Sequence, residues 1–222
     1  MSIGFRINKD WARPGETLIR LFENLPVANI ADCMNRISCI DTAICPYNHC
    51  RLLGPAFTVR CPSGDNLMFH KALDLALPGD IICVAGGGTT ERAYCGEIMM
   101  CYARERGLGG FIIDGSIRDR DEIAQSDFPV YARGVTPNGP YKNGPGEIGF
   151  EVSLGGQVIR PGDILVGDGD GVVVIPIEHA REIAYAARVV FEKENVQKED
   201  ILRNLDRSWI DTALREKGCQ EV

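Results

Sequence analysis

The stretch GGFIIDGSIRDRDEI, residues 109–123, decides the expected fold of this chain. Its apolar run after a glycine pair indicates a buried strand over residues 109–114. The strand ends in an Asp-Gly turn, and residues 118–122 then carry five charges in a row. We expect a short helix near residues 120–126. In open α/β sheets ligands gather beyond the carboxyl ends of strands, so this change from apolar to charged residues marks a candidate site.

Strands and helices alternate around this stretch. Apolar runs predict four strands, over residues 55–61, 81–85, 109–114 and 128–134. Helical spacing predicts the helices between them, over residues 67–77, 91–105 and 120–126. The sequence GGGTT at residues 86–90 is expected to form a loop whose last residue, Thr90, caps the helix after it. This alternation predicts an α/β core with largely parallel strands.

The flanking segments predict helical arms on a single domain of residues 1–222, with the α/β core over residues 50–176. The remaining expected segments are helices at 15–25 and 27–37, a loop at 38–54, a long Gly- and Pro-rich loop at 134–149, a β-hairpin or meander at 151–176 and helices over 177–222. We expect the C-terminal helices to pack on a neighbouring subunit, although an ordinary pair of surface helices fits them nearly as well.

Composition narrows the classes of function. The chain has 222 residues, a net charge of -7 and a pI near 5.1, which argue against a broad nucleic-acid-binding surface. Nine scattered cysteines and a start without an apolar leader favour reduced thiols in the cytoplasm. No apolar stretch approaches 18 residues, so we expect no membrane partner.

One cluster could suggest zinc. It holds four potential ligands within twelve residues: Cys39, Cys45, His49 and Cys50. The cluster lacks the CxxC pair that is usual in structural zinc sites, and we expect ordinary loop and core residues instead. Similarly, Cys95 lies beside Gly96 and Glu97 but has no histidine near it in sequence, so we expect it to pack rather than to act as a nucleophile.

The candidate binding and catalytic residues follow two of the predicted strands. If the strands before residues 86 and 114 are neighbours, the segments that follow them face one cleft. Glycines and a helix N-terminus over 86–98 would suit a carboxylate or phosphate. Arg118 could bind a carboxylate bidentately, and Asp119 could hold Mg²⁺. Together they suit a small 2-oxo acid that chelates a metal. The charged run could equally be a solvated helix start capped by Asp119.

The stretch ERAYCGEIMMCYARERGLGGFIIDGSIRDRDEI resembles the RraA-like family, which includes the metal-dependent, class II 4-hydroxy-4-methyl-2-oxoglutarate/4-carboxy-4-hydroxy-2-oxoadipate aldolases. The matching pieces are Gly96-Glu97, Arg106-Gly107, Gly110, Asp114-Gly115, Arg118-Asp119 and Glu122. The likeness covers roughly residues 50–176. It implies a β/β/α sandwich of the swivelling-domain type, assembled as a homotrimer or homohexamer with sites between subunits.

The resemblance also implies roles at the strand end. Asp119 would be the direct ligand of Mg²⁺ or Mn²⁺, and Arg118 would bind the 2-oxo acid and stabilise the developing enolate. Glu97 corresponds to an acidic residue that holds water at the metal. Gly96 and the backbone N–H groups near Ile98 and Met99 would receive the substrate carboxylate.

Four further residues complete the implied site. Asn66 and His70 would line the pocket, although His70 fits a half-buried helix histidine about as well. Glu122 would orient Arg118. Glu194, with Glu192 close behind, would reach the site of a neighbouring subunit from the C-terminal helix.

The implied activity is cleavage of a 4-hydroxy-2-oxo acid to pyruvate and a carbonyl product. Loss of CO₂ from oxaloacetate would pass through the same enolate. The alternative is a non-catalytic regulator of ribonuclease activity, because the namesake proteins of the family bind an endoribonuclease. Those regulators typically lack the aspartate after the arginine, so Asp119 favours the enzyme.

Overall fold

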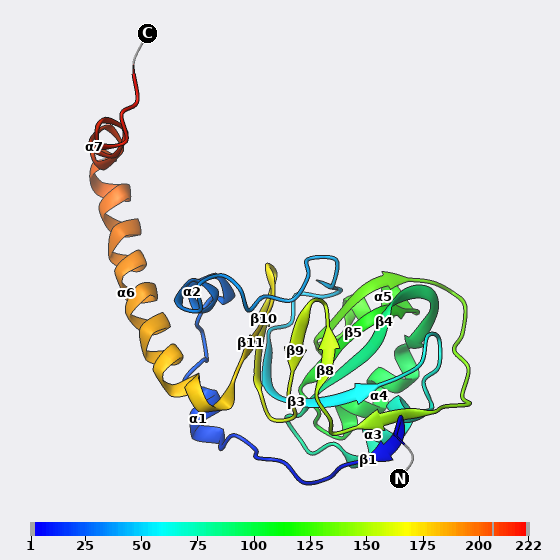
Figure 1. Cartoon of the computed structure of the whole chain (residues 1–222). Coiled ribbons are helices and arrows are strands. Elements are labelled where there is room, and N and C mark those ends of the chain that lie inside the picture. The colour runs from blue at the N-terminus through cyan, green and yellow to red at the C-terminus, as the bar shows by residue number, and fades with distance from the viewer. Residues whose placement is uncertain (1–2, 206, 221–222) are drawn as a thin grey trace.

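The computed structural model describes residues 3–205 and 207–220, and four parallel strands form its centre (Figure 1). These strands are β3 (Leu52–Arg60), β4 (Ile81–Cys95), β5 (Gly110–Ile117) and β6 (Val130–Val135). The helices between them are α3 (Leu67–Leu75), α4 (Glu97–Glu105) and α5 (Arg120–Gln125). The expected βαβ alternation and parallel pairing are therefore confirmed.

Short strands extend this sheet and build a second β layer. The short strands are β1 (Phe5–Ile7), β2 (Cys45–Pro46) and β7 (Gly146–Ile148), and the sheet order is β1-β7-β3-β4-β5-β6-β2, so that β1 and β2 form its edges. The second layer consists of two antiparallel hairpins, β8 (Val152–Leu154) with β9 (Gln157–Ile159) and β10 (Ile164–Asp168) with β11 (Gly171–Ile175). Strand β10 also pairs with β3, which ties the hairpin layer to the central sheet.

The alternation of side chains along β4 explains the layers. Ile82 and Val84 are buried in the core under helices α3 to α5. Ile81 and Cys83 point to the opposite face and are buried against the hairpins. Because successive side chains of a strand point to opposite faces, the apolar first part of this strand, residues 81–85, has both faces covered. The expected β/β/α sandwich is confirmed.

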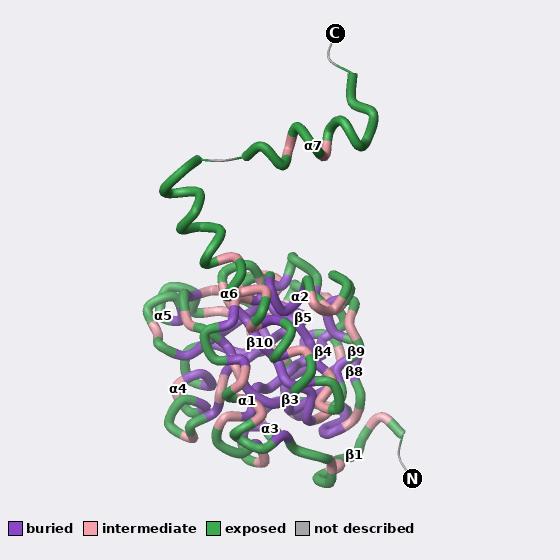
Figure 2. The backbone as a smooth tube through the Cα atoms, turned by 90° about the vertical axis from the view of Figure 1, so that its left-hand side faces the viewer, coloured by how far each residue is buried: buried purple, intermediate pink, exposed green. Residues whose placement is uncertain are grey.

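The helical arms lie outside the second β layer. They comprise α1 (Glu16–Arg20), α2 (Val27–Cys33), a 3₁₀ turn η1 (Ile177–His179), α6 (Ala180–Asn204) and α7 (Trp209–Glu216). A third core cluster joins α2 and the first turns of α6 to β10 and β11. Beyond those turns α6 leaves the body, and its end and α7 are exposed (Figures 1 and 2). Whether a second subunit covers this arm stays a prediction.

The predicted loop at 86–90 and the predicted helix start at 91 are wrong. Strand β4 continues to Cys95 with three register shifts against β5, and α4 begins only at Glu97. Thr90 therefore lies inside a strand and caps no helix; its carbonyl accepts a hydrogen bond from Ser116.

Tyr94 is the physical reason for this extension. It is fully buried, and its hydroxyl donates to the Gly86 carbonyl at 2.9 Å. A Cβ at Gly86 or at Gly115 would lie 2.4 Å from the Tyr94 ring, so both glycines are needed to admit it. Burying this ring keeps the segment extended, although residues 91–105 alone favour a helix.

Smaller differences concern the ends of elements. The predicted helix at 27–37 ends at Cys33, because Asn35 and Arg36 adopt positive φ. The helix at 15–25 is shorter, spanning Glu16–Arg20. The predicted loop at 134–149 contains strand β7, and the helices expected over 177–222 are α6, which ends at Asn204, and α7.

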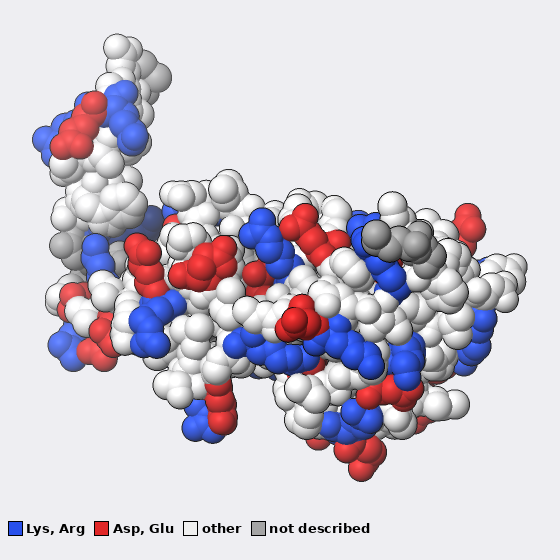
Figure 3. Space-filling view, turned by 60° about the horizontal axis from the view of Figure 1, so that its bottom comes forward, with Lys and Arg blue, Asp and Glu red and all other residues white. Residues whose placement is uncertain are grey.

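Neither the described helices nor the charges on the face drawn in Figure 3 show a single dominant character. No helix in the described ranges is long and apolar enough to cross a membrane. On the face shown in Figure 3, basic and acidic side chains lie side by side. The charge of this face is therefore mixed.

Candidate active site

The carboxyl ends of β4 and β5 bring the two predicted segments together. Cys95 and Ile117 are paired in the parallel ladder, and the Arg118 N–H donates to the Cys95 carbonyl at 3.0 Å. The chain leaves both strands at the same edge of the sheet, so Gly96 and Asp119 become neighbours. The expectation that the segments after these strands face one cleft is confirmed, with the first strand end ten residues later than expected.

Asp119 has an unusual backbone and an open side chain. Its φ is 57°, in the left-handed region that aspartate tolerates better than most residues. Its Oδ2 atom accepts the Glu97 N–H at 2.9 Å and lies 3.7 Å from Arg118 Nε. The side chain is 38% exposed, and in the described residues Oδ1 accepts no hydrogen bond. One carboxylate oxygen is therefore free for a ligand.

Gly96 permits this close approach. A Cβ at this position would lie 2.2 Å from Asp119 Oδ2 and 2.9 Å from Arg118 Cγ. Gly96 also precedes α4, whose first-turn N–H groups at Ile98 and Met99 have no intrahelical acceptor. Such a helix end favours an anion.

These residues line one pocket of about 210 Å³. The lining residues that the sequence predicted are Asn66, His70, Gly96, Ile98, Met99, Arg118 and Asp119. The lining residues that it did not predict as site residues are Cys95, Pro140 and Lys142. Pro140 and Lys142 come from the long loop before β7. The Gly- and Pro-rich composition of this segment predicted a long loop but gave no means of choosing a pocket residue in it.

Asn66 and His70 add polar groups to the pocket. Asn66 is buried, and its Nδ2 donates to the Tyr94 carbonyl at 2.8 Å. Its Oδ1 has no hydrogen-bond donor among the described residues, which is costly unless a ligand supplies one. Partial burial, and then the charge of Lys142, lower the pKa of His70 below its ordinary value. His70 is therefore neutral at pH 7 and offers a hydrogen bond rather than a charge.

Three predicted acids lie outside the pocket lining. Glu97 is exposed, and its backbone N–H is bonded to Asp119. Glu122 is exposed in the first turn of α5, and within the described residues the ion pair of Arg118 is with Asp119 rather than with Glu122. Glu194 is half-buried on α6. The roles of all three stay predictions.

Cys95 does not behave as an activated nucleophile. It is buried, and that burial raises the pKa of its thiol far above the ordinary value. The thiol is therefore protonated at neutral pH, as expected for a packed cysteine.

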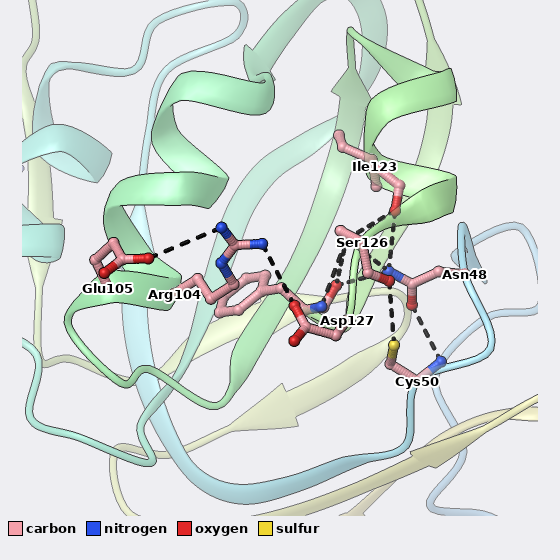
Figure 4. Close-up of polar contacts among 8 residues, drawn as sticks. Asn48, Cys50, Arg104, Glu105, Ile123, Ser126 and Asp127 are labelled. Atoms are coloured by element: carbon pink, nitrogen blue, oxygen red, sulfur yellow. Dashed lines mark hydrogen bonds and ion pairs between the residues drawn. The ribbon is translucent and has the colours of Figure 1, made fainter.

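The cysteine-rich segment predicted as a loop, residues 38–54, bonds to the end of α5. Asn48 Nδ2 donates to the carbonyls of Phe128 at 2.6 Å and Ile123 at 3.2 Å, and Cys50 Sγ donates to the Ser126 carbonyl at 3.4 Å (Figure 4). These bonds fix the end of α5, the helix that Asp119 begins. The predicted loop at 38–54 thus serves as an anchor.

The donor set suits a hydrated hard cation. In residues 3–205 and 207–220 no group of three or more His, Cys, Asp or Glu side chains is placed to hold a metal ion. Mg²⁺ needs fewer, because it keeps several waters and uses one or two carboxylates plus substrate oxygens. The free oxygen of Asp119 fits that requirement, and the part of the chain that the structure describes supplies no further carboxylate to the pocket lining.

Comparison with known proteins identifies the family of this chain. The family model described as "RraA-like: Aldolase/RraA" matches residues 27–174. A protein of Halalkalibacterium halodurans named "Putative 4-hydroxy-4-methyl-2-oxoglutarate aldolase" is 34% identical over 204 residues, 91% of this chain and 89% of that protein.

Two solved structures are also similar. An uncharacterized protein from Pseudomonas syringae pv. tomato has a TM-score of 0.78 at 26% identity and covers 87% of this chain and 96% of its own. The RNA-processing inhibitor RraA from Thermus thermophilis has a TM-score of 0.63 at 26% identity, covering 68% and 92%. On the family match and the relative of 34% identity, this chain belongs to the RraA-like family.

Proposed function

We propose that this protein is a divalent-metal-dependent aldolase that cleaves a 4-hydroxy-2-oxo acid to pyruvate and a carbonyl product. The observation that carries the proposal is the pocket at the ends of β4 and β5. There Arg118, an open Asp119 carboxylate and the first turn of α4 converge. The name of the relative from Halalkalibacterium halodurans supports the aldolase class, and 4-hydroxy-4-methyl-2-oxoglutarate is the first substrate to test.

The chain's own residues account for binding of the 2-oxo acid. The first-turn N–H groups of Ile98 and Met99 would receive its carboxylate, since such groups lack intrahelical acceptors. Arg118 would donate to the 2-oxo oxygen. The unpartnered Oδ1 of Asn66 would accept a hydrogen bond from a hydroxyl group of the substrate.

Cleavage then places negative charge where Arg118 lies. Removal of the proton from the C4 hydroxyl breaks the C3–C4 bond, and its electron pair forms the enolate of pyruvate. The Arg118 guanidinium would stabilise the enolate oxygen, and protonation at C3 would give pyruvate. We propose that a carboxylate accepts the hydroxyl proton through water. The candidates are Glu97, which lies beside the pocket residues Gly96 and Ile98, and Glu194 of a second copy in a trimer or hexamer.

Mg²⁺ or Mn²⁺ at Asp119 would supply Lewis-acid polarisation of the 2-oxo group. Asp119 contributes one negative charge and a free oxygen, and its link to the Glu97 N–H holds that oxygen at the pocket. If CO₂ leaves in place of the carbonyl product, the same enolate forms. We therefore propose oxaloacetate decarboxylation as a second activity of the same site.

Pyruvate release tests the proposal. It is measured with lactate dehydrogenase as the coupling enzyme, from 4-hydroxy-4-methyl-2-oxoglutarate and from oxaloacetate, each with Mg²⁺, with Mn²⁺ and with EDTA. We expect release that depends on the metal, and the ratio between the two substrates ranks the activities. No release from either substrate with either metal would contradict the proposal.

A regulator of ribonuclease activity is the alternative, because the family also contains the RNA-processing inhibitor from Thermus thermophilis. A binding protein has no need of a free carboxylate beside an arginine in a pocket. If the protein inhibits an endoribonuclease, and the Asp119→Asn variant inhibits equally while pyruvate release is absent, the regulator is favoured.

A further inference from the structure

We infer that Arg92 is a positioning residue, which holds the loop before β7 in place so that Gly139 of this loop confines the guanidinium of Arg118. The inference rests on the proposed function. Arg92 itself lies outside the lining of the pocket. Its role follows from the neighbours of Arg118, from the contacts of Arg92 and from the way the loop is held at its other end.

The guanidinium of Arg118 has few neighbours that could fix it. Its side chain is 43% exposed, and within the described residues its ion pair is with Asp119, at 3.7 Å between Nε and Oδ2. That separation is too long for a hydrogen bond. The loop before β7 supplies a second neighbour, because a Cβ at Gly139 would lie 3.4 Å from Arg118 Nη1. The position of Gly139 therefore limits where the guanidinium can lie.

Arg92 binds Gly139 and Tyr141 from the end of β4. Its guanidinium donates to the Gly139 carbonyl and to the Tyr141 hydroxyl, both at 2.8 Å, and lies 4.1 Å from the centre of the Tyr141 ring. Within the described residues Arg92 forms no ion pair, so these contacts with neutral groups of one loop are its polar partners. A charged donor and a cation above an aromatic ring are both strong contacts. Arg92 thus clamps the loop.

Gly64 gives the side chain of Arg92 room to reach the loop. The φ of Gly64 is 68°, and a Cβ there would lie 2.8 Å from Arg92 Cδ. The aliphatic stem of Arg92 therefore lies directly on the Gly64 backbone. The Gly64 carbonyl in turn accepts the Tyr141 N–H at 2.8 Å. Both the stem and the guanidinium of Arg92 thus have fixed neighbours.

The backbone beside Arg92 contacts the same loop. The Ala93 N–H donates to the Asn138 carbonyl at 2.8 Å, and Asn138 Nδ2 donates to the Glu91 carbonyl at 3.1 Å. These contacts exist because β4 continues to Cys95. The extension of β4 therefore forms the surface on which the loop lies, and Arg92 is the charged side chain that joins the two.

Asp65 holds the far end of the loop independently of Arg92. This aspartate is buried, and its Oδ2 accepts the N–H groups of Asn143 at 2.5 Å and Gly144 at 3.0 Å. Its Oδ1 accepts the Leu67 N–H at the start of α3 at 2.9 Å. Loss of the Arg92 side chain is therefore expected to release residues 139–141 without detaching the whole loop.

The proposed reaction needs Arg118 at one position, because its guanidinium stabilises the enolate oxygen. A displacement of about 1 Å by a change far from the reacting atoms can lower a rate about 10²-fold. A released loop would let the guanidinium leave its position beside Gly139. Arg92 thus acts on the reaction through Gly139 and Arg118, without touching the substrate.

Two measurements that need no turnover test the inference. The first is the rate of trypsin cleavage after Lys142, followed by mass spectrometry, since proteolysis of a loop depends on its opening. The second is calorimetry of oxalate binding with Mg²⁺, because this planar dianion resembles the enolate that Arg118 would stabilise. The proteins are the full-length wild type, Arg92→Met, Arg92→Lys and the control Arg160→Met. Arg160 is an exposed arginine that pairs with Glu151 at 3.1 Å and lies outside the pocket lining.

We expect Arg92→Met to speed this cleavage and to weaken oxalate binding, each about tenfold or more, as for loss of hydrogen bonds from a charged donor. Arg92→Lys keeps a cation above the Tyr141 ring and should recover much of both. Arg160→Met should behave as the wild type. Wild-type values in Arg92→Met, a released loop with unchanged oxalate binding, no recovery in Arg92→Lys, or a wild type that does not bind oxalate would each overturn the inference.

Circular dichroism and thermal unfolding establish that each variant is folded. If Arg92→Met does not fold, Tyr141→Ala takes its place, because it removes the ring and the hydroxyl that Arg92 contacts and Tyr141 is 52% exposed. The same two changes are expected in that variant, and wild-type values in it would overturn the inference. Pyruvate release by the wild type decides the proposed function separately, so the two failures are distinguishable.

Discussion

Two Arg–Asp pairs use an aspartate from the stretch that begins with β5, Asp114 inside the strand and Asp119 after it, and they are built in opposite ways. Asp114 meets Arg133 at 2.7 Å with 9% and 20% of their side chains exposed, and Arg133 also reaches Asp41 at 3.2 Å. Asp119 lies 3.7 Å from Arg118, with 38% and 43% exposed. The first pair is closed and satisfied by its own partners. The second is held in place but left open, as a site that must accept a ligand requires.

Backbone geometry produces this difference. Asp114 lies within the strand, beneath the hairpin layer, where Gly155 N–H approaches its Oδ2 at 3.5 Å. Asp119 follows the strand in a left-handed conformation, and among the described residues its carboxylate accepts a hydrogen bond from the Glu97 N–H alone. Two aspartates five residues apart therefore divide into a closed pair and an open pair. The following predictions test that division.

The largest effect is expected for Asp119→Asn. The substitution keeps an acceptor for the Glu97 N–H and a residue that tolerates the left-handed backbone, but it removes the negative charge. We expect pyruvate release to fall about 10²–10³-fold, as for loss of one preorganised group, with unfolding nearly unchanged. Asp121→Asn, an exposed neighbour, is the control. A rate of pyruvate release within about twofold of the wild-type rate would show that Asp119 takes no part in the reaction.

Gly96→Ala should also impair turnover. Its new Cβ would lie 2.2 Å from Asp119 Oδ2 and must displace that carboxylate. A misplacement of this size typically costs about 10²-fold in rate, and steady-state kinetics would measure it. Gly169→Ala is the matched control, because nothing lies within 4 Å of its Cβ. Equal activity of both variants would show that the close approach at Gly96 is unimportant.

Asp114→Asn, which breaks the closed pair with Arg133, should lower stability rather than activity. It leaves Arg133 with only Asp41 as an ion-pair partner, so we expect the free energy of unfolding to fall by about 1–3 kcal/mol. Denaturant titration would measure this change. Metal and ligand binding should persist in the folded variant. A loss of activity without a loss of stability would place Asp114 with the open pair instead.

The smallest expected effect concerns His70. Burial, and then Lys142, lower its pKa in the folded protein, so its contribution to stability is present above the ordinary value near 6.5 and is lost as pH falls below it. Lys142→Met should raise the pKa of His70 towards the ordinary value. NMR titration of the ring protons would detect this, with the resonances of His49 and His179 as internal references. An unchanged titration would show that Lys142 does not face the pocket.

Local pattern predicted where Arg118 and Asp119 lie, because they follow an apolar run that ends a strand. It did not decide between a site and a solvated helix start; the family resemblance supplied their expected roles. The start of α4 could not be predicted, because Tyr94 keeps β4 extended only once Gly86 and Gly115 make room for its ring.

Lys142 required tertiary information as well. Its position depends on Asp65 and Arg92, which are 77 and 50 residues earlier in the chain. A long loop without hydrophobic period shows no such partner in its own sequence. Hydrophobic periodicity therefore could not predict contacts between residues that lie far apart in the sequence.

The most direct test of the central claim is Mn²⁺ binding, followed by electron paramagnetic resonance of the free ion in the presence of pyruvate. Wild type, Asp119→Asn and Asp114→Asn are compared after each is shown to be folded. The open pair predicts that Asp119→Asn weakens binding about tenfold or more, as expected for a lost charged ligand, while Asp114→Asn binds as the wild type does. Binding by Asp119→Asn that equals the wild type, or an equal loss in Asp114→Asn, would contradict the account.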